Sequence, residues 1–218
     1  SYTYDNVGNI TSVTRNGLTT TYEYDSLGQL TRVNDPHAGK STMYLYDCGG
    51  NMTGYLSAPY TLAPTLEGVN ETVFYTYGDS NWKDKVTAIG GKAITYDAIG
   101  NPLTYDGWTF TWKAGRMLAS MVKTGTNAQF TYDHNGLRIK KVVNGVTTNY
   151  TLNGKNVVHM TQGSNDLHFF YDAQGKPGMV TYNDVDYFYV YNLQGDVVAL
   201  IDANGTQVVE YGCLLYTS

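Results

Sequence analysis

The sequence has little charge, little cysteine and little tryptophan, and each shortage excludes a class of protein. Charged residues make up 15% of the 218 residues and the formal net charge is −5, so the chain has no basic footprint for a nucleic-acid backbone. We therefore expect no nucleic-acid partner. The two cysteines, Cys48 and Cys213, are too few for a disulfide framework, and no Cys/His cluster has the spacing of a tetrahedral metal site.

Long apolar runs are also missing. No stretch of about 18 apolar residues would span a bilayer as a helix, and no charged segment followed by an apolar one resembles a secretion signal. The chain begins at Ser1 inside a repeated phrase, without an initiating methionine. We expect a piece of a longer protein whose export signal would lie upstream.

Tyrosine and glycine are abundant by contrast. The chain has 21 tyrosines against 6 phenylalanines, and 24 glycines. This composition is typical of many short β-strands with amphipathic faces separated by tight turns.

One phrase recurs along the chain with a basic step of about twenty residues, and internal repeats of this length define a repeat architecture. Its seven copies read "YDNVGN", "YDSLGQ", "YDCGGN", "YDAIGN", "YDHNGL", "YDAQGK" and "YNLQGD". Two eroded copies, "WKAGRM" and "YTLNGKNV", partly fill the wider gaps.

The chemistry of the phrase predicts a strand that ends in a tight turn. Bulky residues two apart, such as Tyr2 and Tyr4, lie on one face of a strand. The Asp suits the first position of a type I turn, where its carboxylate accepts backbone N–H bonds, and the Gly three residues later supplies a positive φ. The predicted turn residues are Tyr4, Asp5, Gly8, Tyr24, Asp25, Gly28, Tyr46, Asp47, Gly50, Tyr96, Asp97, Gly100, Tyr132, Asp133, Gly136, Tyr171, Asp172, Gly175, Tyr191 and Gly195.

A second class of turn alternates with the first. The dipeptides Asn16-Gly17, Asp106-Gly107, Asn144-Gly145, Asn153-Gly154 and Asn204-Gly205 are strong hairpin signals. Two turn types alternating about every ten residues predict an all-β fold: an antiparallel hairpin meander of about twenty strands, each roughly five to seven residues long.

The strands after the Asp turns have an irregular apolar spacing. Ile10 and Val13 are three apart, as are Leu30 and Val33, which is a helical spacing. A helix is disfavoured by the threonines and the short distance between turn signals, so we expect a β-bulge after each turn glycine.

Two segments depart from the repeat. Residues 54–72, which include Pro59 and Pro64, are predicted to leave the sheet because proline removes a ladder donor. We place residues 1–211 in one repeat array. The tail 212–218, "GCLLYTS", has no repeat residue and resembles translated cloning sequence.

A sheet of about twenty twisted strands cannot stay flat, so the ribbon is expected to curl into a wall with two faces open to water. Tyrosine suits such a wall because its ring is apolar and its hydroxyl can stay solvated. We expect the tyrosines to stack across neighbouring strands, each pair contributing roughly 0.2–1 kcal/mol.

The phrases "YDNVGNITSV", "YDSLGQLTRV", "YDAIGNPLTYDG" and "WTFTWKAGRML" resemble the YD or RHS repeats of bacterial Rhs and wall-associated proteins, and the YD-shell of teneurins and insecticidal toxin-complex subunits. The resemblance covers residues 1 to about 211. It implies a spiral β-ribbon shell that encloses a C-terminal toxin of the same parent chain, and a secreted or cell-surface location. The implied partners are the remaining repeats and that toxin. In this family a conserved Asp-Pro and Gly-Leu core closes the shell, and the sequence stops before any such segment.

No catalytic or cofactor site is predicted. His37, His134, His159 and His168 have no partner at ligand spacing and are interpreted as solvated loop residues. A calcium loop at Asp79, Asn81 and Asp84 lacks its downstream Glu. Nucleotide, hydrolase and metalloprotease motifs are also missing, so we expect a protein that is not an enzyme and binds no cofactor or metal.

A second function stays open. Aromatic hairpin repeats of about twenty residues also occur in choline- and glucan-binding surface modules, where ring faces hold cations or sugars, so a surface glycan is a possible partner. Those modules are rich in Trp, of which this chain has 3. The recurring Asp-to-Gly turn therefore favours the structural shell.

Overall fold

The structure is a computed structural model that describes residues 1–211, and within them it has twenty-one strands and no helix. The tail 212–218 that we interpret as foreign lies outside the described residues. The strands are β1 (Tyr2–Tyr4), β2 (Ile10–Arg15), β3 (Leu18–Tyr24), β4 (Leu30–Asp35), β5 (Lys40–Tyr46), β6 (Met52–Pro59), β7 (Glu71–Thr76), β8 (Ala88–Ile89), β9 (Lys92–Tyr96), β10 (Pro102–Tyr105), β11 (Trp108–Lys113), β12 (Met117–Lys123), β13 (Thr126–Tyr132), β14 (Arg138–Val143), β15 (Val146–Asn153), β16 (Asn156–Gln162), β17 (Asn165–Tyr171), β18 (Pro177–Tyr182), β19 (Val185–Tyr191), β20 (Val197–Ile201) and β21 (Gln207–Glu210). Within residues 1–211 no helix is long and apolar enough to cross a membrane.

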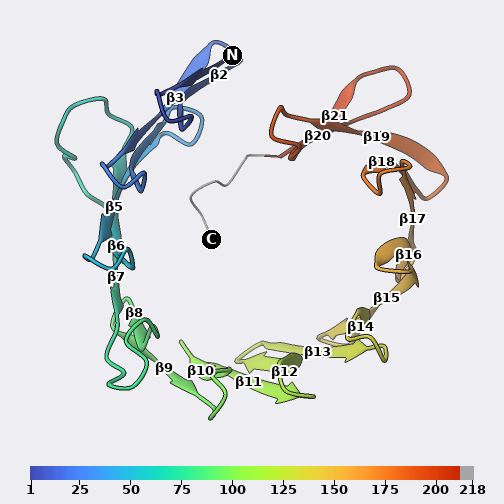
Figure 1. Cartoon of the computed structure of the whole chain (residues 1–218). Coiled ribbons are helices and arrows are strands. Elements are labelled where there is room, and N and C mark those ends of the chain that lie inside the picture. Colours follow the sequence, from blue (N-terminus) through green and yellow to red (C-terminus); the bar gives the residue numbers. More distant parts are fainter. Residues whose placement is uncertain (212–218) are drawn as a thin grey trace. The chain divides into compact units, whose positions relative to one another are not determined.

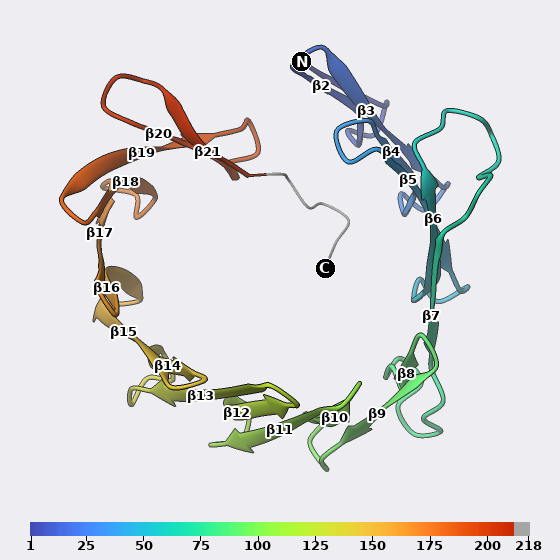
Figure 2. The same ribbon diagram turned by 180° about the vertical axis from the view of Figure 1, so that it is seen from behind.

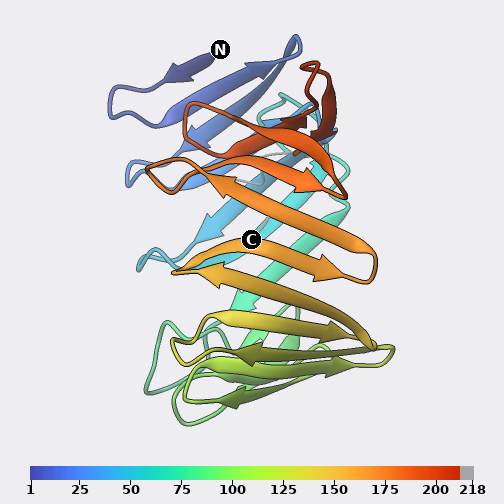
Figure 3. The ribbon, with the colours of Figure 1, turned by 90° about the vertical axis from the view of Figure 1, so that its right-hand side faces the viewer.

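The strands form two compact units, one of residues Ser1–Asp106 and one that begins at Gly107. In the first unit each strand from β1 to β9 pairs antiparallel with the next (Figure 1). In the second unit the same holds from β11 to β21, and Figure 3 shows its strands following one another with alternating direction. The antiparallel meander predicted from the turn spacing is confirmed.

A β-bulge follows the Asp turns, as the apolar spacing predicts. Tyr4 pairs with Ile10 and Thr3 pairs with Ser12, so the residue between them, Thr11, is extra in the second strand. The same shift follows Tyr24, Tyr46, Tyr96, Tyr132, Tyr171 and Tyr191. The bulge explains why apolar residues three apart can share one face of a strand.

The second class of turns is only partly as predicted. Asn16 has φ 50° and Gly17 has φ 77°, and the pair at Asn144 and Gly145 is similar, as type I′ hairpins require. Asp106 and Gly107 also have positive φ.

Two of the five dipeptides do not form the turn that the sequence predicts. Asn153 pairs with Asn156, so the turn there is Gly154 with the following lysine, one residue later than predicted. Asn204-Gly205 belongs to the first class of turn, because the Gly205 N–H donates to the carbonyl oxygen of Asp202. An aspartate three residues before the glycine decides the turn type there, because its carboxylate can accept the backbone N–H groups of the turn.

The excursion predicted for residues 54–72 is narrower than that range. β6 continues to Pro59, which pairs with Lys40, and β7 resumes at Glu71, so only residues 60–70 leave the sheet. Pro59 is tolerated because it is the last residue of its strand. This 60–70 loop lies beside β5 and β6 (Figure 2).

The core is thin because the sheet is a single layer. The buried apolar residues of the first unit are Val33, Tyr44 and Ala58, and those of the second are Ala128, Phe130, Val180 and Ala199. Tyr44 and Tyr55 are partners on neighbouring strands with ring centroids 6.5 Å apart, but their planes differ by 51°, so the rings are tilted and not stacked as expected. The stacked pair, Tyr2 and Tyr4, and a second tilted pair, Tyr189 and Tyr191, each lie within one strand. Residues two apart on a strand point to the same face, which places those rings together.

Candidate functional site: the repeat turns and their hydrogen bonds

Six of the seven repeat turns are closed by the carboxylate of an aspartate, and the seventh by an asparagine side chain. Oδ1 of Asp5 accepts the backbone N–H groups of Val7 at 3.0 Å and Asn9 at 2.8 Å. Asp25, Asp47, Asp97, Asp133 and Asp172 accept the same two bonds, from the residues two and four positions later. In the copy at Tyr191 the aspartate is replaced by Asn192, whose side-chain oxygen accepts the N–H of Asp196 at 2.8 Å. The carboxylate therefore satisfies donors that the turn leaves without a ladder partner.

At Asp47 these hydrogen bonds favour the ionised carboxylate. The pKa of Asp47 is lowered by the hydrogen bond from the Asn51 side chain and then by the backbone N–H of the same residue, against a smaller opposing effect of burial. Asn9 and Asn101 make the matching side-chain bonds to Asp5 and Asp97. The recurring asparagine four residues after the aspartate thus strengthens the same cap.

The turn glycines all have a left-handed backbone, with φ between 76° at Gly28 and 94° at Gly8. The N–H of each glycine donates to the carbonyl oxygen of its turn's Asp or Asn. A side chain at this φ costs backbone strain, which explains a glycine three residues after the aspartate.

The tyrosine before the aspartate makes a contact that the sequence analysis did not foresee. Its hydroxyl was expected to stay in water, but that of Tyr24 donates to the carbonyl oxygen of Ile10 at 3.0 Å, and that of Tyr132 donates to the carbonyl oxygen of Leu118 at 2.9 Å. Tyr46, Tyr96, Tyr171 and Tyr191 likewise donate to the backbone of an earlier strand or loop. In five of these six copies the acceptor is the strand residue immediately before a bulge, where the ladder is interrupted. The hydroxyl therefore links each repeat to the one before it.

Cations cover several of the repeat rings. Lys176 lies 3.5 Å from the ring centroid of Tyr191, Lys113 lies 5.3 Å from that of Tyr132, and Arg138 lies 4.4 Å from that of Phe130. These contacts were not predicted from the sequence. The signal that would have predicted these contacts is the strand register, because it places a basic side chain of one strand over an aromatic ring of a neighbouring strand.

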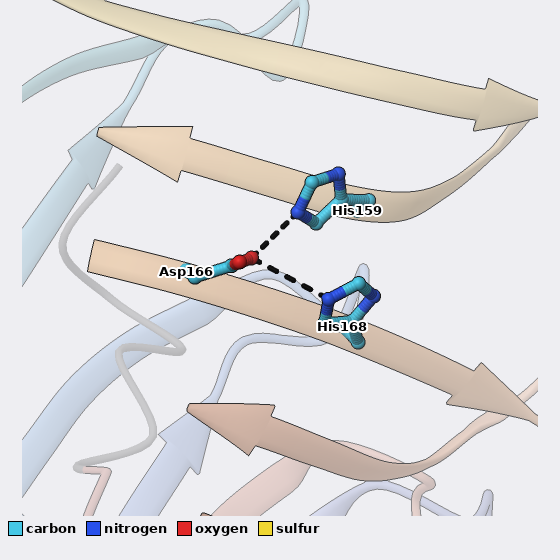
Figure 4. A group of neighbouring side chains, drawn as sticks. All are labelled: His159, Asp166 and His168. Carbon is cyan, nitrogen blue, oxygen red and sulfur yellow. Dashed lines mark hydrogen bonds and ion pairs between the residues drawn. The ribbon is translucent and has the colours of Figure 1, made fainter. Parts of the chain in front are cut away.

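Two histidines interpreted as isolated are in fact neighbours. His159 and His168 are register partners on β16 and β17, with stacked rings whose centroids are 4.3 Å apart, and both lie beside Asp166 (Figure 4). The interpretation failed because the Gly163-Ser164 turn between the two strands was not recognised. His37 and His134 do lie exposed in turns.

The carboxylate considered for calcium has local partners. Asp79 forms an ion pair with Lys85 and accepts the backbone N–H groups of Asn81 and Trp82, each at 2.9 Å. The hydrogen bond from Lys85 is the largest cause that lowers the pKa of Asp79 to about 2. The Asp79 carboxylate is therefore engaged by groups of its own loop.

These features define a class of protein: a repeat sheet in which each Tyr-Asp-Gly turn is capped internally and attached to the preceding repeat. The teneurin YD-shell family matches residues 1–212, nearly the whole sequence, and the chain belongs to that family.

The relatives are much longer proteins. The tRNA3(Ser)-specific nuclease WapA of Bacillus spizizenii is 33% identical over 196 residues, a match that covers 86% of this chain and 8% of the relative. The tRNA nuclease WapA of Bacillus subtilis matches with the same identity and coverage. The chain therefore spans about 8% of the length of the curated relatives that it matches.

Solved structures share the fold. The Tc holotoxin pore of Photorhabdus luminescens matches with a TM-score of 0.63 at 17% identity, over 96% of this chain and 13% of that chain. The crystal structure of TcdB2-TccC3 matches with the same TM-score, identity and coverage. At this identity the likeness shows the fold, and the fold is that of an Rhs-type YD-shell.

Proposed function

We propose that this chain is a structural segment of the shell of a larger secreted or wall-associated toxin protein, and that the complete shell encloses a C-terminal toxin of the same parent chain. The observation that supports this most is the linkage between repeats. The aspartates, glycines and tyrosine hydroxyls that recur in the sequence form hydrogen bonds with the chain's own backbone. The recurring residues therefore have a structural role in the sheet.

The relatives support the second half of the proposal. These relatives are named as tRNA nucleases, yet the chain covers only 8% of their length. Catalytic activity in such a protein would reside in another segment, and the repeat segment would form part of the shell around that segment.

The alternative of a choline- or glycan-binding module is less well supported. Such modules need ring faces that are free to receive a ligand. Here Lys176 already lies over the ring of Tyr191 and Lys123 lies 5.8 Å from the ring centroid of Trp108. Internal cations in these positions would compete with a ligand cation.

Limited proteolysis of the complete parent protein tests enclosure. We expect the segment that follows the repeats to resist trypsin while the shell is intact and to be cut when the shell is opened by Asp133→Ala together with Asp172→Ala. A control variant at an exposed strand position outside the turns, Thr131→Ala on β13, should leave the protection unchanged. A downstream segment cut equally fast in both proteins would refute enclosure.

The 218-residue chain alone tests the absence of catalysis. We expect no cleavage of tRNA by the purified chain. Reproducible cleavage that disappears on a single substitution within the chain would show that the repeat segment is itself an enzyme.

A further inference from the structure

Three potential metal ligands converge on one hairpin of the second unit. Nε2 of His159 lies 2.5 Å from Oδ1 of Asp166, and Nε2 of His168 lies 3.5 Å from the same oxygen. One ligand atom from each of the three residues lies within 4.8 Å of the others. Figure 4 shows the three side chains pointing toward one another from β16 and β17.

The strand register fixes this convergence. His159 is directly opposite His168, and Asp166 is two residues before His168, so the three side chains share one face of the sheet. The two strands are joined by the two-residue turn Gly163-Ser164, which leaves the register little freedom to slip.

The turn between β18 and β19 also holds the backbone of Asp166 in place. Its N–H donates to the side-chain oxygen of Asn183 at 2.8 Å, and its carbonyl oxygen accepts the N–H of the same asparagine at 2.9 Å. The side chains themselves remain accessible, because His159 is 30% exposed, Asp166 is 53% exposed and His168 is 52% exposed. An ion from solution can therefore reach all three.

We propose that His159, Asp166 and His168 bind one divalent transition-metal ion of the zinc class, a role that goes beyond the proposed function of the shell. Two imidazole nitrogens and one carboxylate oxygen are a ligand set that zinc takes, whereas calcium and magnesium require oxygen ligands. Water would complete the coordination.

The spacing fits after small side-chain rotations. Zinc bonds of about 2.0–2.2 Å in a tetrahedral site place neighbouring ligand atoms about 3.3–3.6 Å apart. The distance of 3.5 Å from His168 to Asp166 is already in that range, and the distance of 2.5 Å from His159 to Asp166 must open by about 1 Å. A nearby carboxylate, Asp186, accepts the Thr181 hydroxyl at 2.6 Å and is thereby engaged on the adjacent strands.

The bound ion would tie β16 to β17 through side chains, in addition to the backbone ladder. Its effect would be to hold this hairpin closed, as a local staple in a sheet that has little core. Zinc binding should therefore stabilise the second unit against unfolding.

The test is a titration of the 218-residue chain, free of any histidine tag, with ZnCl2 and separately with CoCl2. Its thiols are alkylated first, because Cys48 is exposed and thiolates also bind zinc. We expect one site for zinc by calorimetry, a visible absorption band with cobalt, and a raised midpoint of thermal unfolding in zinc. CaCl2 should produce neither heat nor stabilisation.

Variants locate the site. His168→Gln and Asp166→Asn should each weaken zinc binding by more than about tenfold, while the matched control His37→Gln should leave the affinity unchanged. Circular dichroism of each variant without metal should match the parent chain, which separates loss of binding from loss of folding. Absence of zinc binding by the folded parent chain, or binding that survives His159→Gln with His168→Gln, would overturn the proposal.

Discussion

Strands β4 to β6 of the first unit are covered by the 60–70 loop, whereas strands β13 to β19 of the second unit are joined only by short turns. The covered strands bury polar groups almost completely: Arg32 is 4% exposed, Ser41 is 0% exposed and Asn34 is 3% exposed. In the second unit the exposed face keeps large apolar side chains in water, such as Phe170 at 47% and Phe188 at 39%. The second unit buries apolar side chains such as Ala128 and Val180, but the 60–70 loop of the first unit allows a long charged side chain, Arg32, to be buried as well.

The loop is held by one side chain above all. The Arg32 guanidinium donates to the carbonyl oxygens of Ala63 at 2.7 Å, Pro64 at 3.0 Å and Thr61 at 3.1 Å, and its Nε donates to the side chain of Asn34 at 2.8 Å. Ser41 adds a bond to the carbonyl oxygen of Thr61 at 2.9 Å. A charge buried this deeply is stable only because its donors are occupied.

The largest expected effect comes from breaking this clamp. Arg32→Ala removes four hydrogen bonds, three of which are donated to carbonyl oxygens of the loop. We therefore expect a loss of roughly 3 kcal/mol in the free energy of unfolding. Arg138→Ala is the matched arginine in the second unit, where the guanidinium lies over the Phe130 ring, and should cost less than about 1 kcal/mol. Urea denaturation measures both. Equal losses in the free energy of unfolding would show that the buried contacts between Arg32 and the loop add no special stability.

A turn glycine provides the second comparison. A Cβ at Gly100 would lie 2.8 Å from the Trp82 ring, whereas one at Gly175 would meet nothing closer than 3.9 Å. Both residues have positive φ, so Gly175→Ala should cost about 1 kcal/mol from backbone strain. Gly100→Ala should cost roughly 2 kcal/mol because Trp82 must also move. The change in Trp82 fluorescence should accompany the larger loss, and identical losses with unchanged fluorescence would contradict the contact.

The sequence predicted those features that depend on neighbouring residues. Asp47 caps residues within four positions of itself, so its partners can be read from the phrase. The Arg32 clamp escaped prediction because its acceptors are backbone carbonyls about thirty residues away in a loop without a pattern. The group at His159 and His168 escaped because one unrecognised two-residue turn hides the register that joins them.

The third effect should be the same in both units. Tyr24→Phe and Tyr132→Phe each remove the hydroxyl that links a repeat to the backbone of the preceding one, and each should cost about 1 kcal/mol. Tyr182→Phe is the control, because its hydroxyl bonds to Asn165 on an exposed surface and its loss should fall within about 0.5 kcal/mol. Denaturant melts of the three variants check the ranking. A cost at Tyr182 as large as at Tyr24 would mean that the link between repeats has no special role.

The smallest effect is expected from acid, because Asp47 is exposed and the Asp79 side chain is still 23% exposed, so solvent screens their interactions. The pKa of Asp79 is lowered from 3.8 to about 2, first by the hydrogen bond from Lys85, and the pKa of Asp47 is lowered in the same direction by Asn51. A lowered folded-state pKa means that the unfolded chain binds more protons between about pH 4 and pH 2, so stability present above pH 4 is lost as the pH falls through that window. We expect the urea midpoint followed by Trp82 fluorescence, with Trp108 and Trp112 replaced by Phe, to decline in this range. Asp79→Asn should flatten the decline, since the variant has no proton to take up at that position. A parent chain whose midpoint stays constant from pH 4 to pH 2, or a variant that declines as steeply as the parent, would show that the ion pair of Asp79 with Lys85 contributes nothing to the folded loop.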